Sequence, residues 1–254
     1  MSRRGLRTWA RFSIILAALS TPFWLAGSLP LPSLAQGLPV SALMAICPTM
    51  TVVLLARCGD RNERWWHLEL LTGRRSLRKG SVLLVCALAM PAVVLLAAAV
   101  DGTSFDDLLD PSVLAAVLVL VVPVVVAATT EEIGWTAWLL PRLAEPWGRR
   151  RAGLVIGLTW GGWHAVPYVQ AENPIPWVVG QVLFSILFRL LIIELSSQAA
   201  MPLLAAILLH ATYNLAWQVI LLSGMTYSPW TTATITTVVL AVLVSHRWED
   251  RSRR

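Results

Sequence analysis

Long apolar blocks, more than any other feature, restrict what this chain can fold into. Residues 113–128 are almost unbroken Val, Leu and Ala, and comparable blocks recur along the sequence. In a bilayer every backbone polar group must be bonded within the protein, so only helices or a closed barrel can cross it. Barrel strands alternate apolar and polar residues, and these blocks do not. The sequence therefore predicts an all-α fold, a polytopic transmembrane helical bundle.

A helix crosses the bilayer with about 20 apolar residues. We expect about eight such spans, at residues 12–29, 38–56, 81–100, 113–139, 152–170, 176–195, 199–222 and 229–245. Charged residues make up 13% of the chain, about half of their share in a soluble domain. We interpret residues 1–254 as a single integral membrane domain, with N-terminal spans in 1–110 and a functional core in about 113–222.

The basic residues indicate how the spans are oriented. All 20 Lys and Arg residues except Arg189 lie before the first span, between the second and third, between the fourth and fifth, or after the last. The opposite loops, around 30–37, 101–112, 171–175 and 223–228, contain none. The positive-inside rule then predicts a protein of the inner (plasma) membrane with both termini on the cytoplasmic side. The net charge of +6 follows from this topology, so we expect the lipid bilayer and no nucleic acid as a partner.

Three features outside the core have simple interpretations. Residues 61–71, which mix arginines with Trp and Leu and include His67, are typical of an amphipathic helix on the cytoplasmic interface. Residues 33–35 follow a basic start and an apolar run, as in a signal-peptide cleavage site, although an ordinary loop fits equally well. The cysteines Cys47, Cys58 and Cys86 have no paired spacing, which argues against a disulfide framework or a Cys-based metal site.

A few ionisable residues lie inside the expected spans, where a charged group costs several kcal/mol and often marks function. At about 1.5 Å per residue, Glu131 lies about 13 Å inside the cytoplasmic boundary, His164 about 18 Å and His210 about 14 Å. Three different helices thus bring a Glu and two His to about the same depth. We therefore expect these residues to form one site.

Local spacing enlarges this expected site. His210 and Asn214 are four residues apart, hence on one helix face, as are Trp160 and His164. Glu131 and Glu132 are adjacent, about 100° apart round a helix, so only one can point at a shared centre, and the other holds the helix or orients partners. Gly157, Gly161 and Gly162 leave room for close helix packing beside His164. Snorkelling or pairing explains Arg189 and Glu194, to which we assign a structural role.

The chemistry of this set leaves alternatives open. A buried carboxylate can act as a general base toward water, and histidines can share its proton. Histidines and an Asn amide can also donate hydrogen bonds to an oxyanion. Glu131, His164 and His210 could equally be three ligands of a metal such as zinc, with one position open for water. The sequence does not separate metal-bound from metal-free activation of water.

Three motifs in this region resemble those of the CPBP family, the CAAX-protease and bacteriocin-processing proteins related to type II CAAX prenyl endopeptidases. They are Glu131-Glu132-Ile133-Gly134-Trp135, Trp160-Gly161-Gly162-Trp163-His164 and His210-Ala211-Thr212-Tyr213-Asn214. The resemblance covers residues 125–220. It implies an intramembrane endopeptidase that opens toward the cytoplasm and acts on peptide or protein substrates at the membrane, prenylated proteins among them.

The resemblance also implies roles for the matched residues. Glu131 would activate water with the help of His164, His210 and Asn214 would stabilise the oxyanion, and Glu132 would support the first motif. Family members are often labelled metalloproteases, which makes zinc an implied cofactor, although direct participation of a metal is disputed.

The first motif departs from the family pattern, which is EExxxR followed by glycine. Here Thr136 stands in place of the arginine and Ala137 in place of the glycine, and Arg142 lies six residues after Thr136. If the missing arginine orients the glutamates, the chain could be a non-catalytic protein that binds peptides, such as an immunity protein. A proton-coupled transporter is a third interpretation, but the sequence shows no internal repeat to support it. We favour the enzyme, because both glutamates, both histidines and the asparagine are present.

Overall fold

The computed structural model describes residues 2–29, 39–58, 77–106, 108 and 110–252. These residues form helices and their connections, with no strand among them. The elements are α1 (Arg3–Gly27), η1 (Val40–Ile46), α2 (Cys47–Cys58), α3 (Leu77–Val100), α4 (Pro111–Glu132), η3 (Ile133–Leu139), α5 (Leu140–Trp147), α6 (Arg149–Gln170), α7 (Ile175–Ser196), α8 (Pro202–Leu222) and α9 (Pro229–Ser252). The predicted all-helical fold is confirmed.

Six helical segments in the described part are long and apolar enough to cross a membrane: Arg3–Gly27, Val40–Arg57, Ser81–Val100, Pro111–Trp147, Ile175–Ser196 and Pro202–Leu222. The predicted spans 152–170 and 229–245 are also helical, as α6 and α9, but they do not meet the same length and hydropathy criteria. The multi-pass membrane character is thus confirmed, and the count of eight spans stays a prediction.

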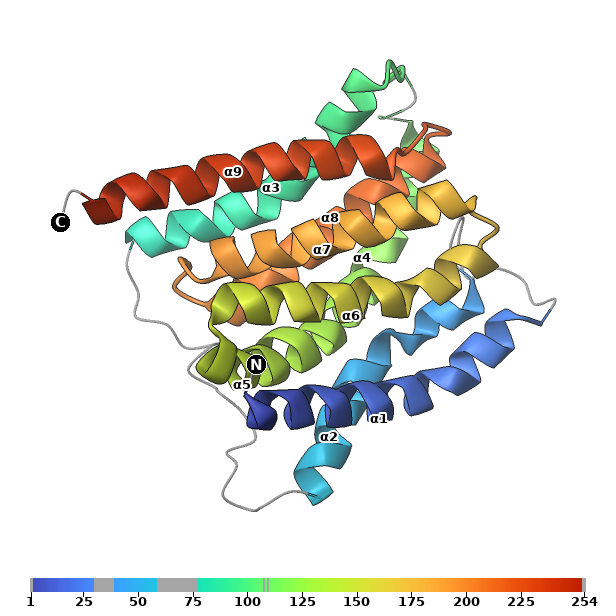
Figure 1. The fold of residues 1–254 in the computed structure, drawn as a ribbon. Helices are drawn as coiled ribbons and strands as arrows, with labels where there is room; N and C mark the ends of the chain where they lie inside the picture. The colour runs from blue at the N-terminus through green and yellow to red at the C-terminus, as the bar shows by residue number, and fades with distance from the viewer. Residues whose placement is uncertain (1, 30–38, 59–76, 107, 109, 253–254) are drawn as a thin grey trace.

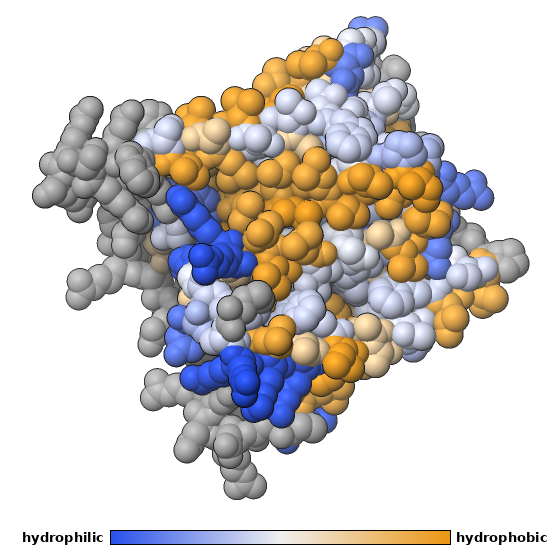
Figure 2. Space-filling view, in the orientation of Figure 1, coloured by the Kyte–Doolittle hydropathy of each residue, from blue (hydrophilic) through white to orange (hydrophobic). Residues whose placement is uncertain are grey.

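The helices lie roughly alongside one another in a bundle (Figure 1). Helix α7 packs between α6 and α9, and α8 packs against α3 and α4. The start of α1, the start of α6 and the end of α9, which carry arginines, lie at the same end of the bundle (Figure 1). Helices α6, α7 and α9 expose apolar side chains, among them Leu154, Leu158, Val179, Leu183 and Val238. Figure 2, drawn in the orientation of Figure 1, shows an apolar area across the middle of the molecule. This surface fits contact with lipid.

Two predictions about the N-terminal half cannot be compared with the structure, because the amphipathic helix at 61–71 with His67 and the cleavage site at 33–35 lie outside the described residues. Cys47 and Cys86 are buried free thiols, as expected for small apolar core residues. The side chain of Cys58 also lies outside the described part.

Glycine determines how closely α6 approaches α7. A Cβ added at Gly157 would lie 3.0 Å from the Cα of Ile186, and one added at Gly161 would lie 3.1 Å from the carbonyl oxygen of Val182. The predicted packing role is confirmed for these two glycines. It is wrong for Gly162, where an added Cβ would meet no atom within 4 Å. Gly153 completes the interface instead, because its Cβ would lie 2.7 Å from Ile193.

The interface predicts different effects for two alanine substitutions. We expect Gly157→Ala to destabilise the protein by about 1–3 kcal/mol, since the new methyl group overpacks the backbone of α7. Gly162→Ala is the matched control on the same helix and should not destabilise it, because its Cβ has open space. Thermal unfolding in detergent measures both. Equal stability of the two variants would contradict the assigned interface.

Candidate active site

The two glutamates lie at the end of α4, where the helix widens. Residues Ile133–Leu139 form a π-helical segment, a type of distortion that is frequent at functional sites. Neighbouring contacts hold this segment: an added Cβ at Gly134 would lie 2.5 Å from the Cβ of Pro48, so η3 rests directly on α2. The hydroxyl of Thr130 donates to the carbonyl of Ala45 at 3.0 Å. The end of α4 is therefore fixed against η1 and α2.

Glu131 and Glu132 have different surroundings, as their spacing predicted. Both are buried, at 3% and 0% exposure. Glu131 lines a cavity, and its Oε2 accepts a hydrogen bond from Nε1 of Trp160 at 2.7 Å. Glu132 does not line the cavity and is held by side chains from other helices. Glu131 is thus the carboxylate that can reach a ligand, and Glu132 is the one that orients partners.

His164 stands beside Glu131. Its Nδ1 lies 3.0 Å from the carbonyl oxygen of Trp160, which can only accept, so this nitrogen carries the proton in the neutral ring. The other nitrogen, Nε2, lies 3.8 Å from Oε1 of Glu131. The lone pair of Nε2 therefore remains available for proton exchange next to the glutamate.

His210 is held by the second glutamate. Its Nδ1 lies 2.9 Å from Oε1 of Glu132, so Nδ1–H donates to the carboxylate. His210 and Asn214 both line the cavity, which confirms that they share one helix face. The amide of Asn214 forms no hydrogen bond with the described residues. One edge of the imidazole and a free amide thus border the space beside Glu131.

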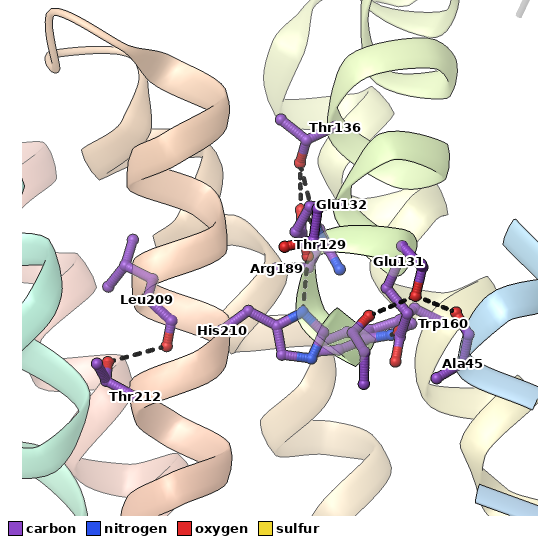
Figure 3. Close-up of polar contacts among 12 residues, drawn as sticks. Ala45, Thr129, Glu131, Glu132, Thr136, Trp160, Arg189, Leu209, His210 and Thr212 are labelled. Carbon is purple, nitrogen blue, oxygen red and sulfur yellow. Dashed lines mark hydrogen bonds and ion pairs between the residues drawn. The ribbon is translucent and has the colours of Figure 1, made fainter. Parts of the chain in front are cut away.

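Trp160 joins these groups into one site. Its ring packs edge-on against His164 and His210, with centroids 5.3 Å and 5.2 Å apart. The guanidinium carbon of Arg189 lies 4.3 Å above the same ring. Figure 3 shows Trp160 and Glu131 beside the group formed by Glu132, Arg189 and His210. The structure therefore brings together all five residues that the sequence singled out.

Arg189 is the residue whose position sequence reasoning missed. It is 1% exposed, so it does not snorkel, and that part of the prediction is wrong. The prediction of an ion pair is right: Nη1 lies 2.8 Å from Oε2 of Glu132. Its presence inside an apolar span was a usable signal, but its partner lies 57 positions earlier in the chain. Glu194, at 8% exposure, is also buried on α7.

The cavity beside Glu131 has a volume of about 380 Å³. It is mainly apolar and is lined by parts of η1, α4, α6, α7 and α8, among them Leu43, Leu120, Pro167, Tyr168, Trp217 and Gln218. These positions lie toward the helix ends that are remote from the arginine-rich segments. Under the predicted orientation this is the extracytoplasmic half, so the lining does not support the expected opening toward the cytoplasm.

A family comparison agrees with the motifs. Residues 113–216 match the family model described as type II CAAX prenyl endopeptidase Rce1-like. This segment belongs to the Rce1-like family. A comparison with curated proteins finds no match to the chain. The Rce1-like segment contains Glu131, Glu132, His164, His210 and Asn214, and also Arg189.

The metal interpretation of the Rce1-like site has no support in the geometry. Within the described residues, no group of three or more His, Cys, Asp or Glu side chains is arranged to hold a metal ion. Glu131, His164 and His210 therefore do not fit a three-ligand zinc site as they stand. Hydrogen bonds and ring contacts hold their positions.

The buried pair in this Rce1-like site predicts a stability effect. Glu132→Ala leaves Arg189 without its counter-charge, so we expect a loss of about 3–5 kcal/mol in unfolding free energy. Glu145→Ala is the control, because Glu145 pairs with Arg4 at the surface and such pairs contribute about 0–1 kcal/mol. Thermal unfolding in detergent compares the two variants. A Glu132→Ala protein as stable as the control would contradict the pairing.

Proposed function

We propose that this protein is an intramembrane endopeptidase that hydrolyses peptide bonds of membrane-associated or prenylated-type substrates. The observation that carries the proposal is the position of Glu131 on the wall of an apolar cavity, with His164, His210 and Asn214 around the same space. The Rce1-like family match supports a protease role of this type. The proposed setting is the inner (plasma) membrane.

In the proposed reaction, Glu131 acts as the general base. Trp160 fixes one carboxylate oxygen and leaves the other on the side of His164. Glu131 takes a proton from water as the water oxygen attacks the carbonyl carbon of the peptide. His164 can share this proton through Nε2. The proton then passes to the amine as the C–N bond breaks, so no further reactant is needed.

The negative charge that develops on the carbonyl oxygen needs hydrogen-bond donors. Asn214 offers an amide that no described side chain uses, and His210 offers Nε2–H when protonated, with its ring direction fixed by Glu132. Donors set in place before the reaction commonly contribute a factor of about 10²–10³ in rate each. We assign the oxyanion site to these two residues.

The cavity suggests how a substrate is held. Its largely apolar lining suits an apolar peptide segment or a hydrocarbon chain, and Tyr213 beside it is hydrogen-bonded to Gln181 at 2.7 Å. We propose that the substrate lies in this cavity and reaches Glu131 from the half of the bundle that is remote from the arginine-rich ends.

The proposal predicts that Glu131→Gln and His164→Ala each abolish cleavage while the protein stays folded. Mass spectrometry of peptide termini compares membranes that carry the wild type with membranes that carry each variant. Glu145→Gln, at the surface, should produce the wild-type termini. Identical termini from wild type and Glu131→Gln, at equal abundance, would overturn the protease assignment and favour a peptide-binding protein.

The ligand geometry predicts a second result. Because Glu131, His164 and His210 do not form a three-ligand group, we expect cleavage to persist after purified protein is treated with a zinc chelator and dialysed. Metal content by mass spectrometry provides the control for complete removal. Loss of cleavage that added zinc restores would establish a metal-dependent reaction instead.

A further inference from the structure

We infer that Arg189 is a positioning residue, which holds Glu132 and, through it, His210 for the reaction. This inference rests on the proposed endopeptidase function. Nη1 of Arg189 donates to Oε2 of Glu132 at 2.8 Å, and Oε1 of the same carboxylate accepts from Nδ1 of His210 at 2.9 Å. With both oxygens occupied, the carboxylate cannot turn without breaking a contact. The ring direction of His210 is therefore set by an arginine on α7.

Thr136 completes the arrangement. Its hydroxyl donates to Oε2 of Glu132 at 2.5 Å, and Nη1 of Arg189 lies 3.4 Å from the same hydroxyl. Position 136 lies one helical turn after Glu132, and a short side chain there leaves space for the guanidinium that arrives from α7. An arginine at both positions would bring two like charges to one carboxylate oxygen. Arg189 therefore supplies, from α7, the arginine that the first motif lacks at position 136, and Thr136 leaves the space for it.

Arg189 also supports the other glutamate. Its guanidinium lies over the ring of Trp160, whose Nε1 donates to Glu131 at 2.7 Å. Such a contact between a cation and an aromatic face is attractive and is strengthened by the absence of water. One side chain therefore contacts the support of the general base and the support of the oxyanion donor. A purely structural counter-charge would need only the contact with Glu132.

The test compares Arg189→Met, Arg189→Lys and the double variant Thr136→Arg/Arg189→Met. Arg142→Met is the matched control, because it removes another arginine that lies 4.3 Å from a tryptophan ring, that of Trp138. Cleavage is measured as kcat and KM per mole of folded protein, quantified by gel filtration in detergent. This normalisation separates a loss of positioning from a loss of folded material.

We expect Arg189→Met to lower kcat about 100-fold with little change in KM, as for a small misplacement of a catalytic group. Arg189→Lys should give a kcat between those of the wild type and Arg189→Met, since lysine keeps the charge and loses the planar guanidinium that lies over Trp160. If Thr136→Arg/Arg189→Met has a kcat at least about tenfold above that of Arg189→Met, a guanidinium from either helix can position Glu132. Wild-type kcat per mole of folded Arg189→Met, or of Arg189→Lys where the methionine variant does not fold, would overturn the inference.

A second measurement does not depend on proteolysis. Arg189→Met and His210→Ala, which share no direct contact in the structure, are combined in a double-mutant cycle on thermal unfolding. Coupling through Glu132 predicts that their effects are not additive. Additive effects would overturn the inference whatever the cleavage assay shows. Absence of Glu131-dependent cleavage with intact coupling would overturn the proposed function alone.

Discussion

The buried pair between Glu132 and Arg189 is the contact on which the rest of the site depends. Both side chains are almost fully excluded from solvent, and such a pair adds little net stability compared with apolar residues, although removal of one partner is costly. What the pair provides is a fixed relation between α4 and α7. His210 on α8 joins through the same carboxylate. Three helices thus meet at one charged group, and their relative positions follow from its geometry.

Close packing gives this charged group its surroundings. Gly157 lets α6 approach the backbone of α7, and an added Cβ there would also lie 3.3 Å from Cβ of Arg189. The same approach brings the ring of Trp160 under the guanidinium. On the other side, Gly134 places the π-helical segment against Pro48. Polar geometry at the centre therefore depends on small residues at two helix interfaces.

Much of the site could be predicted from the sequence because the relevant quantities are local. Helical rise alone placed Glu131, His164 and His210 at one depth, and a spacing of four placed Asn214 beside His210. The sequence could not identify the partner of Arg189, because the pairing depends on how α7 is rotated against α4. The same limit applies to Gly162, since adjacent glycines on α6 face different sides and only the packing decides which side meets α7. The location of the cavity also required the three-dimensional arrangement, because its lining comes from five separate elements.

The separation of the two charges along the chain has a consequence for biosynthesis. Glu132 is made 57 residues before Arg189, which at ribosomal rates is a delay of roughly 3 to 11 seconds. During this time α4 carries two carboxyl groups, and Glu132 lacks the arginine that pairs with it in the folded protein. The nascent chain can complete the central contact only when α7 leaves the insertion machinery, and the histidine of α8 arrives later still. The cluster around Glu132 can therefore be completed only after the C-terminal half of the chain has been made.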